Sequence, residues 1–397
     1  MKALVIAPQP FFTPRGTPFS VYYRTLVLAE NGVDIDLLTY GQGADVDLPR
    51  TRVVRIPSMR WLGKVSVGPS IKKAFLDIFM IAWTLGLLIR HRYQVVHAHE
   101  EAVFWCRFLK PIFRFRLIYD MHSSLPQQLT NFDYTRSRAL IGLFNTLENS
   151  CLHAADAVIT ICPDLSDYAL KVGVDPSKHL LIENCIFDDV KLRSNGDEGL
   201  VTNHDLELQL IARLSQDKRP RVVYAGTFEP YQGIEVLVKA FAGVVEVVPT
   251  AQLVLAGGTP EQIQAMRKLA VDHKVDRSIE FVGTVSKRAA VQLLKLATVL
   301  VSPRMHGTNT PLKIYELLAS GIPLVATRIW SHTQVLNDEV CILVDANAEA
   351  IAQGMITALQ DKVRVESIAR GAQALYESRY TRSIYVQKIR QLISLVA

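Results

Sequence analysis

Short runs of apolar, often β-branched residues recur along the chain, separated by longer segments with apolar residues at helical spacing. Such runs predict buried strands, and their alternation with helices predicts parallel strands joined by crossover helices. The predicted strands of the first half are 3–7, 35–39, 53–56, 94–99, 117–122, 157–161 and 180–184. Those of the second half are 221–226, 251–257, 279–283, 298–303, 323–327 and 341–345.

A polar, irregular stretch from Phe187 to about Pro220 separates the two series of strands. The pattern predicts an α/β protein with two Rossmann-like, doubly wound parallel-sheet domains facing a central cleft. Such sheets bind ligands outside the carboxyl ends of their strands, so the cleft is the expected site. We expect an N-terminal domain at 1–190, a linker or insertion at 191–219, a C-terminal domain at 220–375 and a final amphipathic helix at 376–397.

Composition narrows the class of protein. With 397 residues, of which 49% are hydrophobic and 21% charged, the chain can close two cores, which excludes disorder and collagen-like repetition. The five cysteines follow no zinc or redox spacing, and we expect reduced, buried thiols. The longest uncharged apolar run, 78–89, is much shorter than the ~20 residues of a bilayer span. The N-terminus reads as a strand, so we expect a cytoplasmic protein that does not cross a membrane.

Positive charge is concentrated in one part of the chain. The net charge is +6, yet residues 50–116 contain thirteen Lys and Arg against three acidic residues. Aromatic residues alternate with cations there, as in an interfacial surface, and this favours an anionic membrane as partner. Ordinary core helices with solvated basic flanks are the alternative. Nucleic acid is not expected as a partner, because no nucleic-acid-binding motif is present.

Segment 302–327 reads as a strand, a glycine-containing loop, a helix with a glutamate, and a strand reached through Gly-x-Pro. It resembles the donor-binding segment of family 4 glycosyltransferases, which have the GT-B fold. Segments 155–165, 222–241 and 279–303 are similar to the same family in the same order. The resemblance implies transfer of a hexose-type sugar from a UDP- or GDP-sugar with retention of configuration. The donor would bind the C-terminal domain, and a lipid-linked or saccharide acceptor the N-terminal one.

The candidate donor residues suit a diphosphate, which is held by backbone N–H groups and cations. Thr308, Asn309 and Thr310 can present amides and cap the following helix. Lys313 lies in the first helical turn, where the dipole does not favour a cation, so we expect a ligand there. Arg304 is the second candidate cation. The alternative is a capped helix with a solvated lysine.

The resemblance assigns Glu316 to the two ribose hydroxyls. It also implies donor contacts from Gly226, Thr227, Val285, Gly307 and Leu312. Two departures stand out: Thr308 occupies the place of the family's first glutamate, and Thr227 and Gln232 those of a phosphate-binding Arg and Lys. These departures leave open a non-catalytic nucleotide- or glycan-binding scaffold, and more remotely a nucleotide-sugar epimerase.

In the first half, Gly16 and Thr17 follow the first strand and match the family's glycine loop. His122, at the end of a strand, matches a histidine that contacts the donor sugar. The resemblance implies front-face substitution, in which a phosphate oxygen takes the acceptor proton and His122, Arg304 and Lys313 assist. His97 and His99 share one strand face, where a metal site is conceivable. We nevertheless expect no metal and no other cofactor, as is general for GT-B enzymes.

Overall fold

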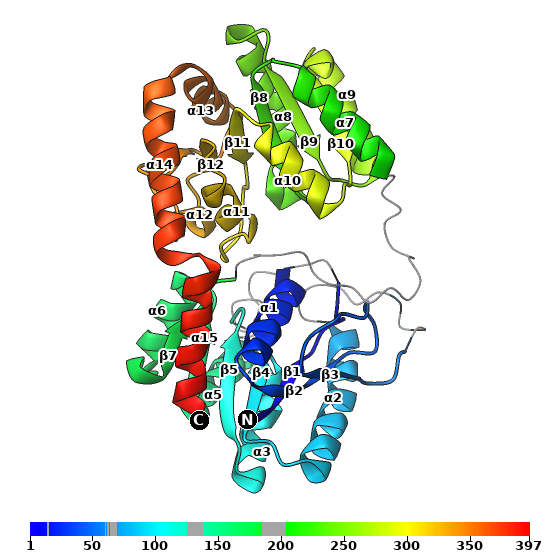
Figure 1. The fold of residues 1–397 in the computed structure, drawn as a ribbon, viewed down its shortest axis with the longest axis vertical. Coiled ribbons are helices and arrows are strands. Elements are labelled where there is room, and N and C mark those ends of the chain that lie inside the picture. The colour runs from blue at the N-terminus through cyan, green and yellow to red at the C-terminus, as the bar shows by residue number, and fades with distance from the viewer. Residues whose placement is uncertain (14–15, 60, 62, 64–69, 125–137, 185–203) are drawn as a thin grey trace. The chain divides into compact units, whose positions relative to one another are not determined.

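The computed structural model describes the chain except for residues 14–15, 60, 62, 64–69, 125–137 and 185–203. The chain forms two units, shown in Figure 1. The N-terminal unit comprises Met1–Asn195 and Arg382–Ala397, and the C-terminal unit comprises Gly196–Thr381.

The N-terminal unit is built on a seven-stranded parallel sheet in the order β3-β2-β1-β4-β5-β6-β7. Its strands are β1 (Lys2–Ala7), β2 (Asp34–Thr39), β3 (Thr51–Arg55), β4 (Val95–His99), β5 (Arg116–Met121), β6 (Ala157–Thr160) and β7 (His179–Leu181). In β1, Leu4 and Ile6 enter one core while Val5 enters the other, because successive side chains point to opposite faces. Burial on both faces explains why the strands read as apolar runs.

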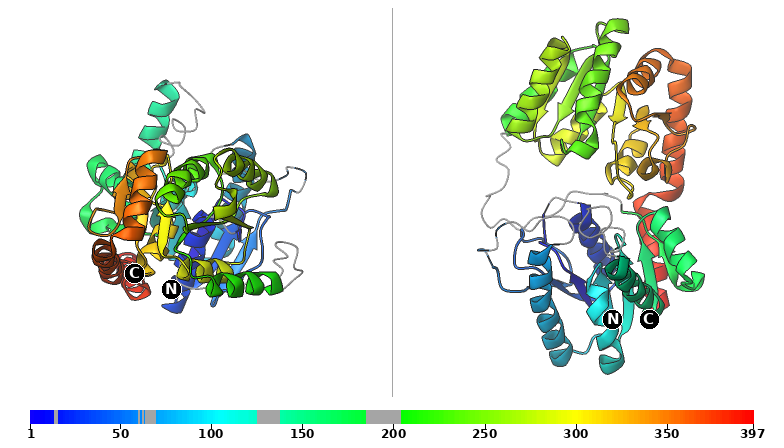
Figure 2. Two further views of the ribbon diagram at one scale, coloured as in Figure 1. Left: turned by 90° about the horizontal axis from the view of Figure 1, so that it is seen from above. Right: turned by 180° about the vertical axis from the view of Figure 1, so that it is seen from behind.

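Helices cover both faces of this sheet, as Figures 1 and 2 show. The described helices are α1 (Gly16–Glu30), α2 (Ile71–Arg90), α3 (Ala102–Phe113), α5 (Arg138–Ala154), α6 (Pro163–Val172), the 3-10 turn η2 (Pro176–Lys178) and α15 (Arg382–Val396). Residues of α2, α3, α5 and α6 share one core, and those of α1 and α15 share the other.

The C-terminal unit has a six-stranded parallel sheet in the order β10-β9-β8-β11-β12-β13. Its strands are β8 (Arg221–Ala225), β9 (Gln252–Ala256), β10 (Ile279–Gly283), β11 (Val299–Ser302), β12 (Leu324–Thr327) and β13 (Ile342–Val344). The helices are α7 (His204–Gln216), η3 (Pro230–Gln232), α8 (Ile234–Val247), α9 (Pro260–Asp272), η4 (Asp276–Ser278), α10 (Lys287–Lys295), α11 (Lys313–Ala319), α12 (Trp330–Thr333), α13 (Ala348–Gln360) and α14 (Lys362–Arg379).

Every predicted strand overlaps an observed one, and both sheets are parallel and doubly wound as predicted. The prediction of an irregular stretch between the two series was wrong in part, because α7 lies within it. This helix buries Leu214 completely, and Glu207 accepts hydrogen bonds from the Ser286 amide (2.7 Å) and hydroxyl (2.6 Å). Helix α7 was not predicted, because it has few buried positions and they lie among polar residues.

The chain ends in two helices, since α14 ends at Arg379 and α15 begins at Arg382. Tyr385, Ile389 and Leu392 of α15 are buried in the N-terminal unit. Arg382 pairs with Glu30 of α1 at 2.6 Å, and Lys388 pairs with Glu183 at the same distance. The last helix is therefore an integral part of the N-terminal unit.

The composition led to expectations about the cysteines and about membrane-spanning helices. Cys106, Cys151, Cys162 and Cys341 are free and buried, as predicted, while Cys185 lies outside the described residues. Among the described helices, none has the length and apolar character needed to span a bilayer.

Candidate functional site

In the C-terminal sheet, successive strands are added on one side of β8 up to β10 and on its other side from β11 onward, so the direction of winding changes between β8 and β11. These two strands pair through Val222 with Val299 and Val223 with Leu300. In doubly wound sheets such a switch point opens a crevice at the carboxyl ends of the strands, where ligands bind. The loop after β8 contains Gly226 and Thr227, and the segment after β11 leads from Arg304 to Lys313.

Lys313 is the first residue of α11, and its ammonium group is buried although its stem is partly accessible. Nζ lies 4.0 Å from the centroid of the Tyr224 ring and, among the described residues, has no hydrogen-bond partner. Burial, and secondarily the nearby Arg304 guanidinium, lower the pKa of Lys313 to about 7. A buried ammonium without an anion is unfavourable, so this geometry favours an anionic ligand.

Arg304 lies two residues beyond β11. Its guanidinium stacks at 5.1 Å from the centroid of the Tyr231 ring, and its Nε donates a hydrogen bond to the His306 carbonyl at 2.7 Å. Burial lowers its pKa. The hydroxyl of Thr327 donates to the Arg304 carbonyl and so fixes the backbone. Neither Arg304 nor Lys313 has an acidic partner within the part of the chain that the structure describes.

Two glycines border these cations. A Cβ at Gly307, whose φ is +140°, would lie 2.3 Å from the Arg304 guanidinium. A Cβ at Gly226 would lie 2.8 Å from the Tyr224 hydroxyl oxygen and 3.4 Å from Lys313 Nζ. The structure thus brings together Gly226, Gly307 and both predicted cations.

The prediction that a threonine caps the helix was wrong. The N-cap of α11 is Leu312, and no side chain caps this helix. Pro311 disfavours helical geometry at the residue before it, so the helix cannot begin at Thr310. The Thr310 hydroxyl is buried and has no partner among the described residues, while Gln334 donates to the Thr308 carbonyl.

The other predicted donor residues lie around the same sheet edge. Glu316 is one turn further along α11, 4.0 Å from Lys287 of α10. Asn309 lies in the segment after β11, and half-buried Val285 lies between β10 and α10. The Thr227 side chain is exposed, and its carbonyl accepts a hydrogen bond from Tyr224 at 2.8 Å.

In the N-terminal unit, the order of the strands reverses between β1 and β4. Gly16 and Thr17 begin α1, after β1, and His122 follows β5 directly. His97 and His99 of β4, Asp120 of β5 and His122 just after β5 are all buried, and His99 is in register with Asp120. Alternate residues of neighbouring strands thus bring four polar groups to one face of the sheet.

Asp120 is the centre of this cluster. One of its carboxylate oxygens lies 2.9 Å from Arg24 Nε and 2.9 Å from His97 Nε2. The Arg24 charge, the nearby histidines and the His97 hydrogen bond outweigh burial and hold the pKa of Asp120 well below its usual range. Since Arg24 belongs to α1, the ion pair ties the helix that begins at Gly16 to β5.

His99 Nδ1 and His122 Nε2 are 2.9 Å apart and share a hydrogen bond. Burial lowers the pKa of His122 to about 4 and that of His99 well below its usual value, although Asp120 opposes both shifts. Both imidazoles are therefore neutral at pH 7.

His97, His99 and Asp120 form the one cluster of potential metal ligands found among the described residues. The rings of His97 and His99 are stacked, with centroids 4.6 Å apart and planes at 15°. A metal ion lies in the plane of each imidazole that binds it, and two stacked rings cannot meet this condition together. Hydrogen bonds and the Arg24 ion pair connect these groups, while His97 Nδ1 and His99 Nε2 are buried without a partner among the described residues.

Sequence reasoning did not single out Arg24, Asp120, Tyr224 or Tyr231 as functional residues. A signal existed for the first two, because each is a charged residue within an apolar strand or helix. A buried charge requires a partner, so the two could have been matched. The tyrosines gave no such signal, since Tyr224 of β8 and Tyr231 of η3 meet the cations only in the folded unit.

Two family models match the chain. The model described as Glycosyltransferase Family 4 matches residues 15–189, and that described as Glycosyl transferases group 1 matches residues 219–361. Together they cover most of the chain in the predicted order. The chain belongs to the family 4 glycosyltransferases.

Among curated relatives of this family 4 chain is a phosphatidyl-myo-inositol mannosyltransferase of Mycobacterium leprae, 31% identical over 181 residues. The match covers 44% of the chain and 46% of the relative, so it spans less than half of that protein's length.

Solved structures match over almost the whole chain. A sucrose-phosphate synthase from Thermosynechococcus elongatus has a TM-score of 0.72 at 20% identity, covering 99% of this chain and 98% of the other. The Anabaena protein HepE, in complex with UDP, has a TM-score of 0.71 at 15% identity, covering 99% and 100%. These similarities show that the fold is GT-B.

Proposed function

We propose that this protein is a retaining glycosyltransferase that moves a hexose from a UDP- or GDP-sugar to a lipid-linked or glycan acceptor. The reaction would take place at the cytoplasmic face of a membrane, in the synthesis of a cell-envelope glycolipid or polysaccharide. One observation carries the proposal: Lys313 and Arg304 lie without an acidic partner, among the described residues, at the switch point of the C-terminal sheet. The UDP bound to the structurally similar Anabaena protein and the activity of the mycobacterial relative support it.

In this proposal the two cations hold the diphosphate of the donor. A side chain at Gly307 would collide with the Arg304 guanidinium, and one at Gly226 would crowd Tyr224 and Lys313, so the two glycines allow the cations to hold these positions. Glu316 then accepts hydrogen bonds from the ribose hydroxyls. Thr227, Val285, Thr308, Asn309, Thr310 and Leu312 complete the proposed donor surface.

The chemical step needs stabilisation of the charge that develops on the leaving diphosphate. Lys313 and Arg304 supply it from fixed positions, and such preorganised contacts typically contribute 10²–10³-fold in rate. The acceptor hydroxyl attacks the anomeric carbon from the side on which the diphosphate leaves, and a phosphate oxygen takes its proton. His122 contacts the donor sugar, while Gly16 and Thr17 approach it through their backbone.

No metal is needed in this scheme, because the chain itself supplies two cations for the diphosphate. The reaction should therefore proceed unchanged in EDTA. If EDTA abolished transfer and Mg²⁺ or Mn²⁺ restored it, the metal-free scheme would be wrong.

The membrane part of the proposal rests on α2 and α3. Exposed apolar side chains lie at helical spacing along one face of α2, at Ile71, Ile78, Ile81, Leu85 and Ile89. Helix α3 also exposes Phe108 and Ile112. The opposite side of α2 is buried through Leu76 and Met80, so the exposed side chains are additional to the face that packs on the sheet. Contiguous exposed apolar surface marks an interaction site.

Exposed basic residues occur in the same part of the chain, at Lys72, Arg90, Arg92, Arg114 and Arg116. Each Lys or Arg near an anionic bilayer contributes about 1 kcal/mol, so several together hold a protein at its surface. An acceptor with a lipid anchor would be presented at the same surface.

The test is thermal unfolding with UDP, GDP, ADP, CMP and dTDP, each with and without EDTA. A nucleotide present at 100 times its Kd stabilises the native state by roughly 2.7 kcal/mol, and we expect UDP or GDP to do so. If none of the five raises the melting temperature, the non-catalytic scaffold, motivated by Thr227, Gln232 and Thr308, becomes the better hypothesis. Incubation with the nucleotide-sugar alone tests the epimerase alternative, since only an epimerase forms a new nucleotide-sugar without acceptor.

A further inference from the structure

A buried histidine connects the ends of β11 and β12, next to the segment that carries Arg304. His332 belongs to the short helix α12, and its side chain is fully buried. Its Nε2 lies 3.0 Å from the hydroxyl of Ser302, the last residue of β11. Its Nδ1 lies 2.8 Å from the carbonyl of Thr327, the last residue of β12. Since β11 and β12 are neighbours in the sheet, one imidazole holds their carboxyl ends together.

The partners of His332 determine which nitrogen carries its proton. A peptide carbonyl can only accept a hydrogen bond, so Nδ1, which faces the Thr327 carbonyl, is protonated. Burial lowers the pKa of His332 to about 4, with smaller contributions from the charges of Lys313 and Arg304, although the bond to Thr327 opposes the shift. The ring is therefore neutral at pH 7, and Nε2 accepts the hydrogen bond that the Ser302 hydroxyl donates.

The same ring N–H also orients the hydroxyl of Thr327. Nδ1 lies 3.2 Å from Thr327 Oγ1, so its hydrogen is shared between the carbonyl and the hydroxyl oxygen of this residue. A hydroxyl that accepts on one side keeps its own hydrogen for another acceptor, and Thr327 donates it to the Arg304 carbonyl. A chain of hydrogen bonds thus leads from the imidazole through Thr327 to the backbone of Arg304.

The segment that carries Arg304 is held on both sides. His332 binds Ser302, two residues before Arg304, and the amide of Met305, just after it, donates to the Tyr231 carbonyl at 2.8 Å. The Tyr231 ring also lies against the Arg304 guanidinium, with 5.1 Å from its centroid. Hydrogen bonds in a buried network strengthen one another, so loss of the imidazole should loosen the whole segment.

From this geometry we infer that His332 is a positioning residue that fixes the place of the Arg304 guanidinium through hydrogen bonds to the ends of β11 and β12. The inference rests on the proposed function, in which Arg304 and Lys313 hold the donor diphosphate. A fixed cation stabilises developing charge without rearrangement, so the place of Arg304 matters as much as its charge. Because His332 is fully buried, it acts through Arg304 and not by contact with the donor.

The first test compares two substitutions of His332 by calorimetric titration of the full-length protein with UDP, GDP and pyrophosphate. His332→Leu removes both hydrogen bonds, whereas His332→Asn can place an N–H near the position of Nδ1. We expect the Kd to rise on the order of tenfold in His332→Leu and to return to within about threefold of the wild type in His332→Asn. Thr327→Val, which removes only the hydroxyl, should resemble His332→Leu and replaces it if that variant does not fold.

A double-mutant cycle with Arg304→Met distinguishes positioning of Arg304 from a general loss of structure. If His332 acts through Arg304, His332→Leu should weaken binding in the wild-type background but not in a protein that already contains Arg304→Met. Equal losses in both backgrounds would overturn the inference, and so would an unchanged Kd in His332→Leu. The same cycle applies to Thr327→Val.

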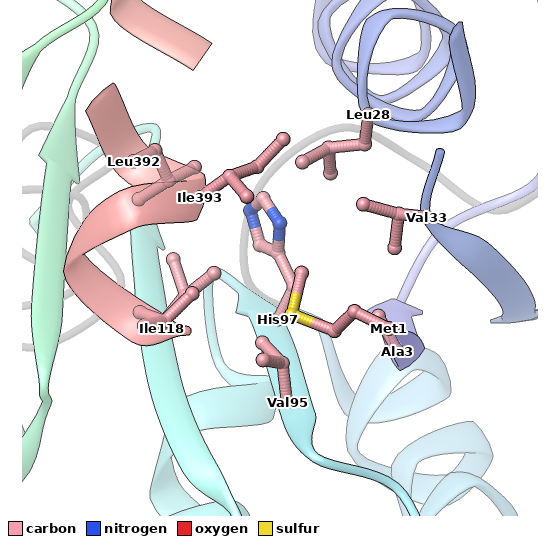
Figure 3. Close-up of a pocket in the computed structure, with 10 residues that line it drawn as sticks. Met1, Ala3, Leu28, Val33, Val95, His97, Ile118, Leu392 and Ile393 are labelled. Atoms are coloured by element: carbon pink, nitrogen blue, oxygen red, sulfur yellow. The ribbon is translucent and has the colours of Figure 1, made fainter. Parts of the chain in front are cut away.

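The matched control is His97→Leu, the same substitution at a buried histidine of the N-terminal unit. Figure 3 shows the His97 ring among apolar side chains that include Leu28, Ile118 and Ile393. The variant loses the hydrogen bond to Asp120 and should melt at a lower temperature. It should keep the wild-type Kd for UDP and GDP, since the candidate donor cations belong to the C-terminal unit. An equal loss of affinity in this control would show that the effect is one of general stability.

The order of the Arg304 side chain gives a readout that needs no ligand. Its Nε–H donates to the His306 carbonyl at 2.7 Å, so the ¹H–¹⁵N NOE of this group should be that of an ordered site in the wild type. Loss of the signal in Arg304→Met assigns it. The NOE should fall in His332→Leu and in Thr327→Val and recover in His332→Asn. An equally ordered Arg304 in all variants would overturn the inference.

These measurements separate the inference from the proposed function. If UDP, GDP and pyrophosphate all fail to bind the wild type, the proposed function fails, and the order of Arg304 alone decides the inference. If nucleotides bind the wild type and the His332 variants bind them equally well, the inference fails while the proposed function stands.

Discussion

Replacing Lys313 by methionine tests whether this lysine is a buried cation kept without a partner for the donor. Its pKa is about 7, against 10.5 for an ordinary lysine, because burial and Arg304 disfavour the charge. The unfolded chain solvates the same lysine and keeps the usual pKa. Between the two values the unfolded state binds more protons, so stability rises with pH across this window. With about 1.4 kcal/mol per tenfold change in proton affinity, Lys313 should add about 3 kcal/mol to the free energy of unfolding between pH 7 and pH 10.

Lys313→Met removes this dependence while filling nearly the same volume. The variant should gain stability relative to the wild type at pH 7, and the difference should shrink by about 3 kcal/mol as the pH is raised to 10. Urea unfolding followed by circular dichroism, with both proteins compared at each pH, measures it. Lys268→Met, at an exposed lysine of α9, should show a difference that does not vary with pH. If the stability difference between Lys313→Met and the wild type is also independent of pH, the reasoning is refuted, because the Lys313 ammonium would then be solvated or paired. The same variant should lose affinity for UDP and GDP.

Three further predictions address other parts of the molecule. Glu316→Ala should weaken UDP or GDP binding by about 1.5–3 kcal/mol but leave pyrophosphate binding unchanged, since pyrophosphate has no ribose. Equal losses of nucleotide and pyrophosphate affinity in calorimetry would contradict a contact between Glu316 and the ribose. Asp120→Asn should lower the free energy of unfolding by about 3–5 kcal/mol, because it leaves the buried Arg24 without its anionic partner. Asp34→Asn, which breaks a surface pair with Arg50, should lower it by under about 1 kcal/mol. Equal effects of the two substitutions in urea unfolding would show that the Arg24–Asp120 pair is not buried. Sedimentation of the protein with anionic vesicles should decrease as salt is added. It should also decrease in Ile78→Asp but not in the control Val271→Asp, which changes an exposed residue of the C-terminal unit. If Ile78→Asp still binds the vesicles, the exposed face of α2 is not the membrane-binding surface.

The sequence by itself determined the architecture. The central strands are buried on both faces, so their apolar runs are visible in the chain without knowledge of their neighbours, as in β1. The order of strands and helices then leaves parallel sheets as the favoured arrangement. Lys313 could be singled out for a similar reason, since a cation at a helix start is a local anomaly.

Only the tertiary structure decided what surrounds those residues. That Lys313 lies against Tyr224, without an anion among the described residues, depends on strand β8, more than eighty residues earlier in the chain. The cluster around Asp120 joins residues of α1, β4 and β5, three elements that are brought together only by folding. Helix α7 was missed because its buried contacts are few. Burial periodicity is a property of neighbouring residues, whereas the partner of a charge is set by segments that folding brings together.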